Sequence, residues 1–194
     1  MAQGNREDDD AWKSITAVAN ESREYLQSLL PAHIFLAAVT SLMKGGDVEV
    51  RARAVRLVVD RISTTDPASS EVSLFFDLMP DLVELLKDHE NTESSTLVRQ
   101  AALVAVEHIA RVFSLWGKKD KHAHHFLSAL GRSIDLLHQP CQKLHNDAST
   151  ITTLDNVSRS MISSVALCSA TLVRATGARC VATLPKLMKR LIIA

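Results

Sequence analysis

The run His-Ala-His-His, from His122 to His125, is the one cluster in the sequence with the composition of a metal site. On a helix, His122 and His125 would lie three positions apart on one face, where the two rings could share an ion. Zinc needs a fuller set of ligands, and Asp120 is the only carboxylate or cysteine at a useful spacing. A solvated surface run is therefore the favoured interpretation, and we predict no metal and no cofactor.

A basic stretch precedes the histidines. Lys118, Lys119 and Lys121 follow Trp116 between two expected helices. Lysines can bind phosphates and an indole can stack on a base, so these lysines are candidate RNA contacts. The favoured alternative is a solvated loop, with Trp116 packed on the core. A second basic set, Lys186, Lys189 and Arg190, would lie on one side of the last helix.

Signatures of enzymes are missing from the sequence. It contains no GxGxxG, Walker, GxSxG or HExxH motif. Cys141, Cys168 and Cys180 are odd in number, widely spaced and without a CxxC pair, which indicates buried thiols in a reducing compartment. We therefore predict that the protein is not an enzyme and has neither catalytic nor cofactor-binding residues.

Composition and charge narrow the class further. Hydrophobic residues make up 46% of the 194 residues, and aromatic residues only 4%. The chain contains only six glycines and five prolines, and this composition favours helices. The 22 basic residues balance 22 acidic ones, so no global positive field attracts nucleic acid, although a local basic face can exist. The polar start MAQGNREDDD is unlike a secretory signal, and no uninterrupted apolar run approaches the roughly 20 residues that span a bilayer. We expect a soluble intracellular protein that has no membrane partner.

Amphipathic segments follow one another along the chain and would position these side chains. The first places apolar residues on one helical stripe, and the second restarts at Pro31. We expect the second helix to end in a left-handed cap at Gly45-Gly46, and Asp47 to cap the next helix. The stripe residues are Trp12, Ile15, Ala19, Leu26 and Leu29, then Ile34, Phe35, Ala38, Val39 and Leu42.

One helical pattern occurs twice, 48 residues apart: VRARAVRLVVDRI from Val50 and VRQAALVAVEHIA from Val98. Alanines on the inward stripe would let a neighbouring helix approach closely. Arg51 and Arg99 lie beside the stripe, where each could reach a carboxylate or carbonyl on the adjoining repeat. The inward positions are Val50, Ala54, Val55, Val58 and Ile62 in the first copy, and Val98, Ala102, Leu103, Val106 and Ala110 in the second.

Other segments complete a unit of helix, turn and helix. Leu74 to Asp88 would form a first helix that Pro80 kinks or restarts. A third unit pairs a helix at Phe126, Leu130, Ile134 and Leu137 with a helix from Ser158 to Gly177, and another first helix begins after that. The period of nearly 50 residues predicts an all-α fold, a HEAT/armadillo-like α-solenoid of about three to four helical pairs. Residues 1–10 would be a disordered acidic N-terminus, and residues 11–194 the repeat array, a fragment of a longer solenoid.

The Leu-x-x-Leu-x-Leu-x-Pro-like first helices and Val-Arg-x-x-Ala second helices resemble HEAT repeats. VRARAVRLVVDRI and the run from Val165 to Leu191 are similar to the C-terminal part of the large HEAT-repeat scaffold of the small-subunit processome, a U3 snoRNP-associated family. The resemblance implies a non-catalytic scaffold in ribosome biogenesis, supporting pre-rRNA transcription and processing in the nucleolus of the nucleus. It also implies other processome proteins and small nucleolar or pre-ribosomal RNA as partners, and no small-molecule substrate.

Two other classes remain open. A generic HEAT adaptor, such as a transport receptor, a phosphatase scaffold or a microtubule-binding array, would share every helical pattern above. A small helical enzyme would need convergent polar residues inside the stack, where the sequence places Ala, Val and Leu.

Overall fold

The computed structural model describes residues 12–19, 21–22, 25, 29–87, 93–115, 122–137, 156–185 and 188–189. Within these ranges the fold is all-α, without strands, as the composition predicts. The five longer helices are α2 (Ala32–Met43), α3 (Val48–Thr64), α6 (Glu93–Leu115), α7 (Ala123–Leu136) and α9 (Asn156–Thr176). The shorter elements are α4 (Val72–Phe75), η1 (Phe76–Leu78), α5 (Met79–Leu85) and η4 (Gly177–Cys180).

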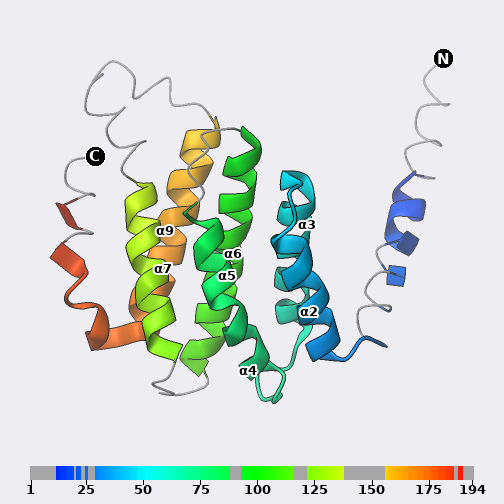
Figure 1. Cartoon of the computed structure of the whole chain (residues 1–194), viewed down its shortest axis with the longest axis horizontal. Coiled ribbons are helices and arrows are strands. Elements are labelled where there is room, and N and C mark those ends of the chain that lie inside the picture. The colour runs from blue at the N-terminus through cyan, green and yellow to red at the C-terminus, as the bar shows by residue number, and fades with distance from the viewer. Residues whose placement is uncertain are drawn as a thin grey trace.

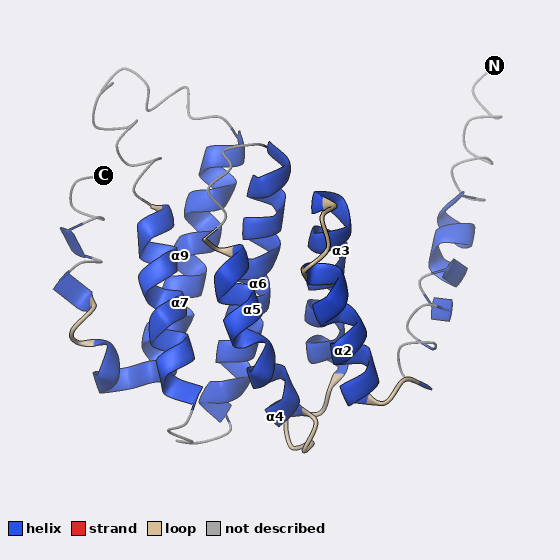
Figure 2. Cartoon of the chain, in the orientation of Figure 1, coloured by secondary structure: helices blue, strands red, loops and turns tan. Residues whose placement is uncertain are grey.

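The helices lie side by side in two layers (Figures 1 and 2). One layer contains α3, α6 and α9, and α6 packs against both of its neighbours. The other contains α2, α4 with α5, and α7, with α4 against α2 and α5 against α7. Between the layers, α2 packs on α3, α5 on α6 and α7 on α9. Helices that follow each other in the chain therefore form pairs, and the pairs are arranged in chain order.

The two copies of the repeated pattern form α3 and α6. Nine of the ten predicted inward residues are buried, and the alanines Ala54 and Ala102 have no exposed surface. The prediction is wrong for Val50, which is 38% exposed. α3 begins only two residues before Val50, whereas α6 begins five residues before Val98. Val50 therefore lies at an open helix end, while Val98 has an additional helical turn before it.

Asp47 caps α3 as predicted. Its Oδ1 accepts hydrogen bonds from the backbone amides of Glu49, at 2.8 Å, and Val50, at 3.0 Å. These are two of the amides that have no acceptor within the helix. The expected left-handed cap at Gly45-Gly46 is wrong, because Gly177, with φ of 58°, is the only residue with positive φ in the described part of the chain. α2 instead ends in a tightened turn, in which the Gly45 amide donates to the Leu42 carbonyl at 3.1 Å.

Pro80 lies at the start of α5, directly after the 3₁₀ turn η1, so the predicted restart of the helix is confirmed. The apolar stripe of α7 is also confirmed, since Phe126, Leu130, Ile134 and Leu137 are all buried. α9 ends before Gly177, whose left-handed conformation is typical of a helix C-terminus. Local sequence patterns thus predict most of these boundaries.

The N-terminal stripe differs from its prediction. Residues 12–19 are helical, but Trp12, Ile15, Ala19 and Leu29 are exposed, and Leu26 lies outside the described residues. In Figure 1 this segment stands apart from α2 and α3. Its apolar side chains therefore do not contribute to the core of the chain. On α2, Ile34, Ala38 and Leu42 are likewise exposed, whereas Phe35 and Val39 are buried.

Candidate functional site

The candidate RNA contacts Lys118, Lys119 and Lys121 lie outside the described residues, as does Trp116. The nearest described helices are α6, which ends at Leu115, and α7, which begins at Ala123. The expectation of a connection between two helices therefore agrees with the elements on either side. The RNA contact itself stays a prediction.

The arginines of the repeated pattern occupy different environments. Arg99 is buried, and its guanidinium donates to Ser95 on its own helix, to the hydroxyl at 2.8 Å and to the carbonyl at 3.3 Å. Arg51 is half-buried near the start of α3. The hydrogen bonds to Ser95 fix Arg99 along α6, and the proposed reach of either arginine to an adjoining repeat stays a prediction.

Asp120, the carboxylate that the sequence places near His122 and His125, lies outside the described residues. His122 is buried against the Phe76 ring, with 5.1 Å between centroids, and its ring centroid lies 6.5 Å from that of His125. No group of three His, Cys, Asp or Glu residues among the described positions could hold an ion. Partial burial, together with His124 and His122, lowers the pKa of His125 below its ordinary value, against an opposing effect of Asp77. A lowered pKa favours the neutral ring.

A buried carboxylate lies between α6 and α9. Glu107 Oε1 accepts from Arg111 Nη2 at 2.5 Å and Nε at 3.2 Å, and from the Thr171 hydroxyl of α9 at 3.3 Å. Glu107 Oε2 lies 3.2 Å from His108 Nδ1, a nitrogen that also lies 2.9 Å from the Val104 carbonyl. The Glu107 side chain is 4% exposed, whereas that of Arg111 is 62% exposed. The carboxylate thus joins a surface guanidinium to a neighbouring helix.

A buried thiol lies near this carboxylate, and two buried hydroxyls link α9 to α7. Burial, and secondarily the charge of Glu107, raises the pKa of the Cys168 thiol, which keeps it protonated and poorly nucleophilic. Ser169 of α9 donates to Ser133 of α7 at 3.3 Å, and both side chains are buried. The Ser169–Ser133 and Thr171–Glu107 hydrogen bonds join α9 to α7 and to α6, an arrangement that helps to set the relative position of the three helices.

The sequence analysis did not identify Glu107 and Arg111 as functional residues. Their signal was an i, i+4 Glu-Arg pair on a helix, at positions where the first copy of the pattern has Val59 and Ser63. That signal is common on exposed helix faces. The contact that distinguishes Glu107 comes from Thr171, 64 positions along the chain.

Arg61 was also missed, and it joins three segments. Its Nη2 donates to the Leu30 carbonyl at 3.2 Å and lies 3.6 Å from Glu71 Oε2. The guanidinium carbon lies 5.6 Å from the centroid of the Phe35 ring on α2. Arg61 therefore connects the end of α3 to the start of α2 and to the α3–α4 connection.

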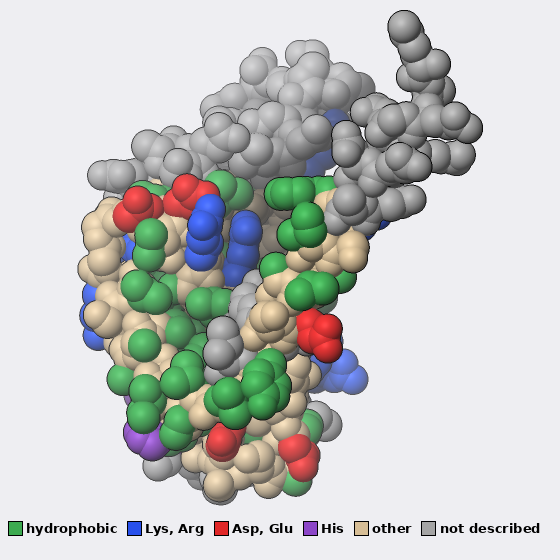
Figure 3. Space-filling model, turned by 90° about the vertical axis from the view of Figure 1, so that its right-hand side faces the viewer, with side chains coloured by type: hydrophobic (Ala, Val, Ile, Leu, Met, Phe, Trp, Pro, Cys, Tyr) green, Lys and Arg blue, Asp and Glu red, His purple; other side chains and the backbone are tan. Residues whose placement is uncertain are grey.

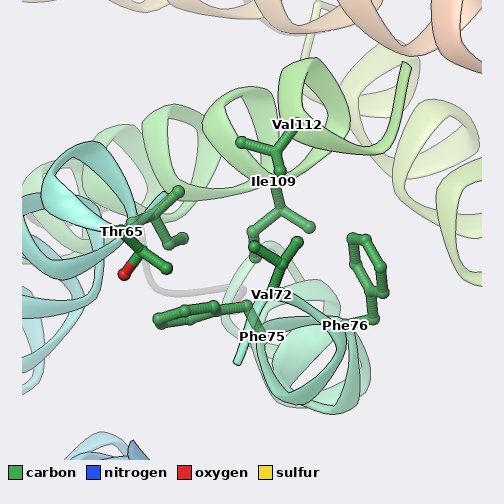
Figure 4. Close-up of a pocket in the computed structure, with 7 residues that line it drawn as sticks. Thr65, Val72, Phe75, Phe76, Ile109 and Val112 are labelled. Atoms are coloured by element: carbon green, nitrogen blue, oxygen red, sulfur yellow. The ribbon is translucent and has the colours of Figure 1, made fainter. Parts of the chain in front are cut away.

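A small cavity lies where α3, α4 and α6 meet (Figure 4). Ile62, Val72, Phe75, Phe76, Ile109 and Val112 line it with apolar side chains, and Thr65 contributes a hydroxyl. That hydroxyl donates to the Arg61 carbonyl at 2.7 Å. Its volume of ≈ 10 Å³, counted as the space open to the centre of a water molecule, is about enough for one water, so this cavity does not hold an organic ligand.

One helical segment among the described residues, Arg159–Cys180, is long and apolar enough to cross a membrane by length and composition. The sequence analysis missed it because serines and threonines interrupt its apolar residues. In the fold, 33% of its apolar stretch is buried, and α9 packs against α6 and α7. Length and apolar composition are weak evidence for a membrane span, because core helices have the same features.

Comparison with known proteins finds no matching family model, no curated relative and no similar solved structure. The geometry defines the class as an all-α protein whose helices form packed pairs. Two of its polar contacts, Glu107–Thr171 and Ser133–Ser169, join different helices. Among the described residues, this arrangement is suited to holding helices in register and to presenting their outer faces.

Proposed function

We propose that the protein is a non-catalytic helical-repeat scaffold of the HEAT type, an α-solenoid that works in ribosome biogenesis as part of the small-subunit processome. The packing of consecutive helix pairs in chain order supports the repeat architecture. α6, the central helix of its layer, packs against α3 on one side and α9 on the other, as expected when each repeat contacts its neighbours. Such a stack presents long outer faces on which partners can bind.

The role in ribosome biogenesis follows from the sequence resemblance to the processome scaffold family. Its partners would be other processome proteins and small nucleolar or pre-ribosomal RNA, in the nucleolus. The test is affinity purification of the tagged protein from nuclear extract, with identification of bound protein and RNA. Recovery of U3 snoRNA with processome proteins is the expected result. Recovery of neither contradicts the proposal.

A generic HEAT adaptor is the second candidate, and the same geometry supports it. The purification distinguishes the two, because an adaptor would recover transport factors, a phosphatase catalytic subunit or tubulin without small nucleolar RNA. The stack alone favours neither, since both use the faces that repeat packing creates.

Direct RNA contact is a separate part of the proposal, located at Lys118, Lys119 and Lys121. Replacing the three lysines with glutamate should weaken RNA binding and flatten its salt dependence, by about one unit of slope for each phosphate that the variant no longer neutralises. A matched variant, Arg53→Glu with Arg56→Glu, changes exposed charges on α3 and should leave the slope unchanged. Equal binding by the lysine variant at every salt concentration would exclude this loop.

A further inference from the structure

The outward face of α9 exposes apolar side chains, two of which are alanines. Opposite the face that packs on α6 and α7, α9 exposes Ala166, Leu167 and Ala170, with Leu167 at 57%. Val181 and Met188 beyond the helix are 60% and 51% exposed. Alanines on a helix face allow a second helix to approach closely, while a leucine beside them offers area to bury. We call Ala166, Leu167 and Ala170 the α9 face.

The α9 face lies in a strongly basic part of the chain. Residues 156–194 contain six basic residues and no acidic one. Arg174, Arg179 and Lys189 are exposed in the structure. An occupant of this face should therefore combine apolar side chains with negative charge. The basic residues are Arg159, Arg174, Arg179, Lys186, Lys189 and Arg190.

The same chain carries a segment with those properties at the opposite end of the molecule. Residues 12–19 are helical and exposed on all sides, and Trp12, Ile15 and Val18 are 68%, 60% and 60% exposed. Trp12, Ile15 and Val18 are spaced three residues apart, so they share one stripe. The sequence around this stripe is acidic, with six carboxylates against three basic residues in residues 1–30. A short helix with no partner is marginally stable in water, so contact with another surface would stabilise it.

The geometry excludes contact between these two surfaces within one copy. In Figure 1 residues 12–19 lie at one end of the long axis, and α2, α3 and α6 lie between them and α9. Figure 3 shows the end that carries the N-terminal segment, where hydrophobic side chains gather. Ile34 and Leu42 of α2 are exposed as well. The two surfaces can meet only between copies.

We propose that the protein assembles head to tail, with the stripe Trp12, Ile15 and Val18 of one copy packed on the α9 face of the next. Apolar burial would provide the stabilisation, and opposite charges on the two surfaces would orient them. The contact is heterologous, since it joins two different surfaces, and it can therefore extend beyond a dimer. This inference does not depend on the cellular role proposed above.

The test is light scattering after size exclusion, with the full chain at several concentrations. The mass of the wild type should rise above the 21.3 kDa of one chain as concentration increases, and salt should shift the assembly toward monomer. Two variants block one surface each: Ile15→Lys with Val18→Lys, and Leu167→Glu with Ala170→Glu. All four residues are exposed, so circular dichroism should show an unchanged fold.

The decisive sample is an equimolar mixture of the two variants. Each variant alone should be a monomer. The mixture should form particles of twice the monomer mass and none larger, because the intact stripe of one variant can bind only the intact α9 face of the other. Leu97→Glu with Val104→Glu is the matched control, since both residues are exposed on α6 and should leave assembly unchanged. A monomeric wild type at all concentrations overturns the proposal, as does a mixture that stays monomeric.

Discussion

Glu107 shows how one residue can link two helices by charge and hydrogen bonding together. Burying a carboxylate is costly, and here Arg111 and the Thr171 hydroxyl both satisfy the same oxygen. Because Arg111 is largely exposed, water solvates the guanidinium while the carboxylate stays dry. The two partners of this ion pair therefore respond differently to substitution.

Arg111→Ala should lower the free energy of unfolding by about 1–3 kcal/mol, since it leaves a buried carboxylate without its charged partner. Adding Glu107→Gln should recover part of this loss, because a neutral amide is cheaper to bury than a charge. Urea denaturation measures both effects. Arg53→Ala is the control: the Arg53–Glu49 pair has the same spacing but is exposed, and its removal should cost at most about 0.5 kcal/mol. Equal effects of the two arginine substitutions would contradict the role of burial.

His125 gives a prediction about pH. Its pKa is lowered in the folded state, so the unfolded chain binds the proton more readily and protonation favours unfolding. This contribution to stability is complete above the ordinary value of 6.5 and decreases as the pH falls from there toward the lowered pKa. His125→Asn should therefore reduce the loss of Tm between about pH 7.5 and pH 5. Asp77, His122 and His124 stay in place in the variant, so an unchanged pH profile would show that His125 is not the responsible group.

At the scale of helices, Ala102 tests the contact that the repeated pattern predicts. It has no exposed surface on α6, so Ala102→Leu should overpack the contact and cost on the order of 1–3 kcal/mol. Val104→Leu, at an exposed position two residues away, should change stability by less than about 0.5 kcal/mol. Thermal unfolding compares the two. An unchanged Tm for Ala102→Leu would show that this position can accommodate a larger side chain.

The helices were predictable where local patterns determine them. Asp47 caps α3, Pro80 restarts a helix and Gly177 follows α9, because each of these residues acts on its immediate neighbours. Two errors have local causes as well, the tightened turn that ends α2 at Gly45 and the exposure of Val50. Val50 has the same local pattern as Val98, but it lies near the open start of its helix and is exposed.

The missed polar contacts depend instead on neighbours in space. Arg61 meets Leu30 across 31 positions, and Glu107 meets Thr171 across 64, so neither contact appears in a window of helical length. The N-terminal stripe shows the converse. Its spacing correctly predicts a helix over residues 12–19, but the side chains of these residues are exposed. Periodicity predicts an apolar face without specifying what covers it.

At the scale of the whole molecule, the order of the pairs implies that stability is local. α3 and α9 lie on opposite sides of α6. A substitution that destabilises one end of the stack can therefore affect the other end only through the helices between them. In a repeat array, stability is approximately a sum of repeat and neighbour-interface contributions. A compact helical domain of this size would instead unfold as one cooperative unit.

Hydrogen exchange with two buried substitutions can distinguish these cases. Val58→Ala in α3 should remove about 1.5–3 kcal/mol of burial, and Leu130→Ala in α7 about 2–5 kcal/mol. In a repeat array, the α3 substitution should reduce amide protection in α2 and α3 more than in α7 and α9, and the α7 substitution should do the reverse. The central helix α6, which has packed neighbours on both sides, should keep the highest protection in both variants. Equal loss along the whole chain would mean that the pairs unfold together, and it would contradict the proposed solenoid.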